Sequence, residues 1–122
     1  MMMSPFQGVL MSRCLDNEIM LAAAVTEPRL PELSRAMSRC LTVMFDYDDK
    51  RRRVEVHAIG QSTKDGSFVM RGYMPDDERP WRLFSVAKIQ NLELTFDDSR
   101  APREGYTVDD KQMSVVLVQI AQ

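Results

Sequence analysis

The second half of the chain alternates apolar and polar residues in short segments that turns interrupt. Residues 54–60, VEVHAIG, place valine and alanine on one face and glutamate and histidine on the other. A KDG turn at residues 64–66 leads to a second such segment, residues 67–74, and an MPDDERP loop leads to a third, residues 81–86. A two-residue period across such turns is typical of an antiparallel meander.

Three further segments have strand character. Leu41 to Tyr47 places branched and aromatic residues on one face and ends in a DYDDK turn, where aspartate readily adopts turn geometry. Residues 87–96, AKIQNLELTF, supply another strand, whose register the pattern leaves open. Ser114 to Ile120 contains a run that is apolar on both faces, which favours a covered strand.

The first forty residues predict helices. From Leu15 to Thr26 the chain is rich in alanine, and a proline two residues later stops any helix. Apolar residues then recur at helical spacing, so we predict a second, amphipathic helix from about Pro31 to Cys40. Residues 1–14 have no clear period and are predicted to be a flexible lead.

Length and composition fit one globular domain. The chain has 122 residues, 44% of them hydrophobic and 28% charged, with a net charge of −2 that argues against a dedicated nucleic-acid binder. Two cysteines, Cys14 and Cys40, lie in no metal-binding motif, so we expect reduced thiols, a cytoplasmic location and no cofactor. The most apolar run, residues 19–25, is too short to cross a membrane.

Basic and aromatic residues gather on the predicted strands and form the main candidate site. Arg71 and Tyr73 share one strand face, and the next strand is expected to bring Arg82 beside them, with Lys88 following. Guanidinium groups bind anions through paired hydrogen bonds. The alternative is a set of exposed charges paired with nearby acids, for which the candidates are Glu55, Asp77 and Glu78.

Three other features have a functional and a structural interpretation. His57, the single histidine, suits a hydrogen bond to a ligand, but a strand histidine without a nucleophile or metal partner is more often structural. Trp81 suits stacking on a base, or packing in the core. The KRRR run at residues 50–53 suits phosphate binding, or a solvated turn that the neighbouring aspartates balance.

The segments VEVHAIG, FVMRGY and WRLFSVAKI follow one another in an order and spacing that resemble the WYL domain, over roughly residues 35–106. Phe68, Val69 and Met70 stand where the name-giving Trp, Tyr and Leu would stand, and Ser85 stands where the family often has arginine. The resemblance implies a ligand-facing sheet that recognises an anion or nucleic acid through Arg71, Arg82 and Lys88, with His or Tyr at position 57. It also implies that the segment PREGYTVDDK lies over the sheet and supplies Arg103.

Together these features predict an α+β domain over residues 15–122. We expect a small SH3-like or Sm-like antiparallel β-barrel, residues 42–122, preceded by two short N-terminal helices within residues 15–41. The expected role is a non-catalytic, ligand-sensing regulatory module that binds a nucleotide or single-stranded nucleic acid at Arg71, Tyr73, Arg82, Lys88 and His57. A regulatory protein partner and a homo-oligomer are also expected. The alternative is an oligomeric interaction module without a small ligand.

Overall fold

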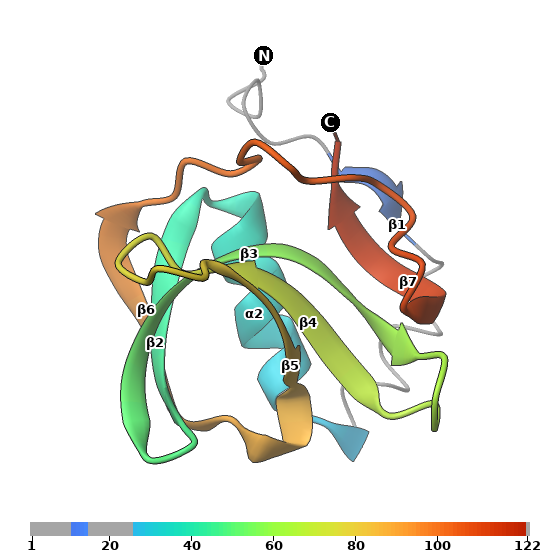
Figure 1. The fold of residues 1–122 in the computed structure, drawn as a ribbon, viewed down its shortest axis with the longest axis horizontal. Helices are drawn as coiled ribbons and strands as arrows, with labels where there is room; N and C mark the ends of the chain where they lie inside the picture. The colour runs from blue at the N-terminus through green and yellow to red at the C-terminus, as the bar shows by residue number, and fades with distance from the viewer. Residues whose placement is uncertain (1–10, 15–25, 122) are drawn as a thin grey trace.

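The computed structural model describes residues 11–14 and 26–121, which fold into one antiparallel sheet and a helix that packs on it (Figure 1). The elements in chain order are β1 (Met11–Cys14), α2 (Arg29–Ser38), β2 (Leu41–Tyr47), β3 (Lys50–Ser62), β4 (Phe68–Tyr73), β5 (Trp81–Ser85), the 3-10 helix η1 (Val86–Lys88), β6 (Gln90–Asp98) and β7 (Met113–Ile120).

The long strand β3 joins the two parts of the sheet. Its first residues, Lys50 to Val54, pair with β2, while its later residues pair with β4 and β7. The strand order is β1-β7-β3-β2-β6, and β4 pairs with β3 and carries β5 on its other side. Every pairing is antiparallel, as the alternating pattern predicts.

Local sequence accounts for the hairpin and the helix that frame the core. Asp48 and Asp49 both have positive φ, 53° and 63°, in the two-residue turn between β2 and β3, a conformation that aspartate tolerates better than most residues. In α2 the buried residues recur at helical spacing and pack with β2 and β3; they are Leu30, Leu33, Ala36 and Met37. Across the core, the rings of Phe45 and Phe84 meet edge to face with centroids 5.1 Å apart.

The predicted fold class is wrong. Within residues 11–14 and 26–121 there is one α-helix, not two, and a strand, β1, precedes it. β6 pairs with β2 and β5 pairs with β4, and no pairing among the described residues joins β6 to β5. The sequence pattern misses β1 because this strand forms through pairing with β7, about a hundred residues later, and a local period does not connect such distant segments.

Some sequence predictions fall outside the described residues. They are the lead over residues 1–10 and almost all of the helix expected from Leu15 to Thr26. The end of the expected lead, Met11–Cys14, forms β1 and pairs with β7. No helix in the described ranges has the length and apolar character needed to cross a membrane.

Candidate functional site

A long loop, residues 99–112, crosses from β6 to β7 (Figure 1). A buried carboxylate on β3 anchors it. Glu55 accepts hydrogen bonds from Nε of Arg103 at 2.7 Å, from its Nη2 at 3.1 Å and from the backbone N–H of Arg100 at 3.0 Å. Burial alone would raise the pKa of Glu55, but these donors together lower it below its ordinary value. The carboxylate is therefore ionised at neutral pH and fixes the loop.

His57 provides a second anchor for the same loop. The backbone N–H of Arg103 donates to Nε2 of His57 at 3.0 Å, so Nδ1 must carry the proton, which it donates to the carbonyl oxygen of Glu55 at 3.0 Å. The side chain is fully buried, and burial lowers the pKa of His57 to about 4. A neutral ring with both nitrogens engaged is suited to holding the loop in place.

Aromatic rings extend from His57 across the sheet. Glu55, Tyr73 and Trp81 are register partners on β3, β4 and β5, so their side chains form a row. Trp81 meets His57 edge to face at 4.7 Å and Tyr73 at 5.0 Å between ring centroids. The guanidinium of Arg103 lies 4.7 Å from the centre of the Tyr73 ring. The loop thus packs on the aromatic side chains through Arg103, and it is also hydrogen-bonded to Glu55 and His57.

Tyr106 continues the aromatic surface from the loop side. Its ring is nearly parallel to that of Trp81, with an angle of 19° and centroids 6.4 Å apart. Its hydroxyl donates to the carbonyl oxygen of Ile120 at 2.7 Å, and burial is the main reason that the pKa of Tyr106 rises to about 12. Gly105 has a φ of +93°, and a Cβ there would lie 3.1 Å from Nε1 of Trp81, so glycine suits this close approach.

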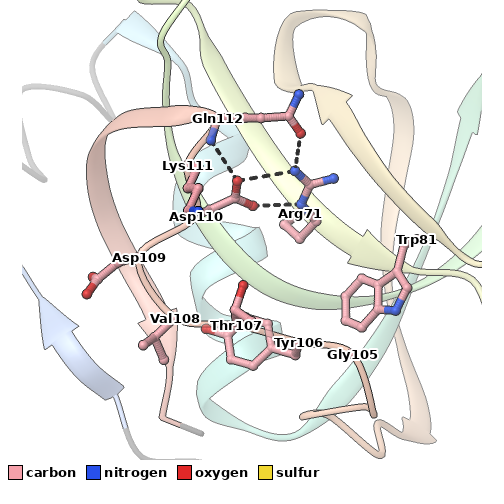
Figure 2. A pocket seen from close by; sticks show the side chains of 10 residues that line it. All are labelled: Arg71, Trp81, Gly105, Tyr106, Thr107, Val108, Asp109, Asp110, Lys111 and Gln112. Atoms are coloured by element: carbon pink, nitrogen blue, oxygen red, sulfur yellow. Dashed lines mark hydrogen bonds and ion pairs between the residues drawn. The ribbon is translucent and has the colours of Figure 1, made fainter.

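A pocket of about 550 Å³ opens between this aromatic pair and the end of the loop (Figure 2). Its lining residues are Arg71, Trp81, Gly105, Tyr106, Thr107, Val108, Asp109, Asp110, Lys111 and Gln112. Figure 2 shows the two rings along one side and a polar group, formed by Arg71 with Asp110 and Gln112, along the other. The pocket therefore combines flat apolar surface with directional hydrogen-bonding groups.

Arg71 is held in a fixed orientation in this polar wall. Its Nε donates to Oδ2 of Asp110 at 2.7 Å and its Nη2 to Oδ1 at 3.2 Å, while Nη2 also donates to Oε1 of Gln112. Burial would raise the pKa of Asp110, but Arg71 and the backbone N–H of Gln112 lower it more. The guanidinium is thus neutralised and presents a hydrogen-bonding pattern more than a net charge.

The structure divides the residues that the sequence analysis grouped. Arg71 and Tyr73 share a face of β4, as expected, whereas Arg82 is the register partner of Gly72 and so points to the opposite face. There its Nη2 lies 2.6 Å from Oδ2 of Asp48. The basic cluster expected from Arg71 and Arg82 is therefore not assembled in this structure.

Lys88 lies apart from the Arg71 pocket. It is exposed in η1 and lines a second pocket of about 560 Å³, beside the turn between β2 and β3. Five other residues of this pocket are charged, namely Asp46, Asp48, Asp49, Lys50 and Arg51. Of the KRRR run, Arg51 pairs with Asp46 and Glu93, which matches the solvated-turn interpretation.

Sequence reasoning missed the partners that define the site. Asp110 and Gln112 lie about forty positions after Arg71, and no local period connects such distant residues. The sequence pattern suggests Glu55 only as a partner of surface charges, whereas in the structure its side chain is 1% exposed. The one available signal was the PREGYTVDDK segment, which does lie over the sheet and brings Arg103 to it.

Within the described residues, no three His, Cys, Asp or Glu side chains come together in an arrangement that could hold a metal ion. No protein-family model, curated protein or solved structure matches the chain. The resemblance to the WYL domain therefore stays a prediction, and function has to be argued from the pocket itself.

Proposed function

We propose that this protein is a non-catalytic binding module that takes a planar ring, the base of a nucleotide or of a single-stranded nucleic acid, in the pocket beside Trp81. One observation carries the proposal. The nearly parallel rings of Trp81 and Tyr106 and the fixed polar group at Arg71 line the same pocket of about 550 Å³. A base needs these two surfaces together, a flat one for its face and a polar one for its edge.

The aromatic side suits stacking. Each base stacked on an aromatic side chain contributes about 1–3 kcal/mol to binding, with little dependence on sequence. Trp81 supplies the open face, because Tyr106 is only 4% exposed and its bond to Ile120 fixes its ring beside Trp81. Trp81 is only partly buried, so part of its surface is open to a ligand.

The polar side suits recognition of a base edge. The group at Arg71 offers guanidinium donors together with carboxylate and amide acceptors from Asp110 and Gln112. Because Asp110 neutralises Arg71, this wall favours a matching hydrogen-bond pattern over a simple anion. Lys111 is exposed and lines the pocket, and we assign it the contact to a phosphate.

The site is organised before the ligand arrives. Glu55, His57 and Asp110 hold the loop through bonds that a ligand in the pocket does not need to break. Little ordering is then required on binding, which preserves affinity. We also propose that the protein acts through a regulatory protein partner and that it is cytoplasmic. The cytoplasmic location is proposed because two cysteines are too few for a disulfide framework.

Calorimetric titration with nucleosides, nucleotides and short single-stranded DNA and RNA tests the proposal. Arg71→Lys keeps the positive charge but removes the planar guanidinium group with its paired donors. We expect it to weaken the binding of all of these ligands about tenfold, or about 1.4 kcal/mol. Lys111→Ala should weaken nucleotides severalfold and leave nucleosides unchanged. Lys64→Ala removes an exposed lysine in the β3–β4 turn that does not line the pocket, and serves as the matched control.

Two results would count against the proposal. One is the absence of heat from every ligand at millimolar concentration. The other is binding that Arg71→Lys leaves unchanged while Lys88→Ala abolishes it, which would move the site to the pocket beside the β2–β3 turn. Molecular mass recorded at the same protein concentrations would show whether the chain is instead an oligomeric module without a small ligand.

A further inference from the structure

The edge strand β6 has one partner strand among the described residues. It pairs with β2 along one side. Its nine residues make it longer than β5, the five-residue strand that lies at the edge beyond β4. In a strand, backbone N–H and C=O groups point alternately to the two sides. The outer side of β6 therefore offers backbone donors and acceptors that a further strand can pair with. Side chains already engage some backbone groups of β6: the N–H of Asp97 donates to Oγ1 of Thr95, and the carbonyl oxygen of Asn91 accepts from Arg51.

Apolar surface lies on and beside this edge. Phe96 of β6 is 96% exposed and is the one large hydrophobic side chain so exposed in the described part of the chain. Leu92, four residues earlier, is partly buried and lines a pocket of about 390 Å³ shared with the start of α2. A single exposed phenylalanine is common on protein surfaces, but here it accompanies an adjacent pocket and a strand edge with no further partner strand in residues 11–14 and 26–121.

The charge of this edge restricts its partner. β6 carries Glu93, Asp97 and Asp98 and no lysine or arginine. The side chains of Glu93 and Asp97 are both 63% exposed, even though Arg51 and Arg53 reach them from β3. The neighbouring pocket adds two more glutamates, Glu27 and Glu32, against one arginine.

A second copy of the chain fits this edge poorly. If β6 paired with β6 of another copy, three carboxylates from each strand would face an equally acidic strand, and like charges placed opposite each other destabilise a sheet. A segment rich in lysine or arginine would meet complementary charge instead. An apolar residue within that segment would cover Phe96 or enter the pocket at Leu92.

From these observations we propose that β6 is a docking strand for an extended, basic segment of another protein, which adds to the sheet edge and covers Phe96. Pairing of the backbones supplies affinity, and the carboxylates select for basic residues. This interface uses none of the pocket residues at Arg71 and Trp81, so it stands or falls independently of the ring-binding proposal.

The test is fluorescence anisotropy with a labelled nine-residue peptide in which lysine and valine alternate. A second peptide with glutamate at each lysine position is the ligand control. We expect the lysine peptide to bind and the glutamate peptide not to bind. Phe96→Ala and Asp98→Lys should each weaken binding of the lysine peptide at least about fivefold, corresponding to about 1 kcal/mol. Glu78→Lys, a charge reversal at an exposed residue in the β4–β5 loop, should leave it unchanged.

Both β6 substitutions fall at exposed positions and should leave the fold intact, which a melting curve checks. Equal binding of the two peptides, or an affinity that Phe96→Ala does not change, would overturn the proposal. So would the absence of binding by the lysine peptide at millimolar concentration. Self-association that Phe96→Ala abolishes would assign the edge to a second copy and also overturn it.

Discussion

At the scale of single residues, the most consequential side chain is a glutamate in the interior. Glu55 is 1% exposed, and its two oxygens accept three of the hydrogen bonds that tie Arg100 and Arg103 to β3. A buried carboxylate with this many donors is stabilised, whereas removing it leaves its partners unsatisfied. The position of the loop, and with it the shape of the pocket, depends on this residue.

Replacing Glu55 by Ala should destabilise the protein by about 3 kcal/mol, because a part-buried guanidinium and a backbone N–H lose their acceptor. Urea unfolding followed by circular dichroism measures this difference. Glu78→Ala, at an exposed loop position, should change the free energy of unfolding by no more than about 0.5 kcal/mol. Equal effects of the two substitutions would show that the buried pair does not anchor the loop.

His57 makes stability depend on pH. Its pKa is about 4 in the folded protein and about 6.5 when unfolded, so between these values the unfolded state binds the additional proton. Stability should therefore be constant above about pH 6.5 and fall as the pH drops toward 4, by about 3 kcal/mol in total. The charged groups facing the ring are Glu55 and Arg103; Glu55 keeps a lowered pKa and is still ionised over most of this window.

Urea unfolding at several pH values between about 7 and 4.5 checks this prediction. His57→Gln has no titratable ring and should show a much flatter dependence across the window, at a lower stability throughout. A wild-type protein whose free energy of unfolding is the same at both ends of the range would contradict the buried, neutral histidine.

At the scale of elements, the contact between β3 and β7 sets the place where the loop returns to the sheet. Gly60 on β3 pairs with Val116, and a Cβ at position 60 would overlap the carbonyl oxygen of Val115 and lie 2.7 Å from Sδ of Met113. The backbone of β7 therefore approaches β3 more closely than any residue other than glycine at position 60 would allow. Both strands shift register near this point.

Gly60→Ala should accordingly destabilise the protein by about 2 kcal/mol or more, since a strand backbone has to move to admit the methyl group. Thermal melting measures the effect, with Thr63→Ala at an exposed turn position as the control. Because β7 would move with the end of the loop, ring ligands should also bind more weakly to Gly60→Ala. A variant as stable as the native protein would mean that the close approach is not present in solution.

The elements also mark the limit of sequence-based prediction here. The strand predicted over residues 41–47 coincides with β2, and the segment predicted over residues 67–74 contains β4, because period and turn residues are local signals. The partners of those strands are not local. The register that turns Arg82 away from Arg71 follows from its pairing with Gly72, and the sequence carries no sign of it.

The candidate site shows the same limit. Arg71, Tyr73 and His57 were identified because they lie on alternating strands, and all three contact or line the region beneath the loop. Their acceptors come from elsewhere, Asp110 from the irregular segment and Glu55 from a position whose burial depends on that segment. A long loop that folds onto a sheet through charged contacts leaves no period by which it could be predicted.

At the scale of the whole molecule, the sheet presents two separate surfaces with different chemistry. The pocket at Trp81 combines aromatic rings with a neutralised polar group, and the edge at β6 combines acidic residues with an exposed phenylalanine. A net charge of −2, with Arg71, Arg82 and Arg103 each held in an ion pair, does not suit strong, nonspecific attraction to nucleic acid. Selective recognition of a ring at one surface and of a basic segment at the other fits this distribution better.

Binding of a planar ring beside Trp81 is tested most directly by the fluorescence of Trp81 itself, since the chain contains one tryptophan. Its fluorescence should be recorded while nucleoside monophosphates are added, with ribose 5-phosphate as a ligand that has the sugar and phosphate but no base. We expect saturable quenching by the nucleotides, weaker in Arg71→Lys, and no quenching by ribose 5-phosphate. Unchanged fluorescence with every nucleotide, or equal responses to the nucleotides and to ribose 5-phosphate, would contradict the ring-binding proposal.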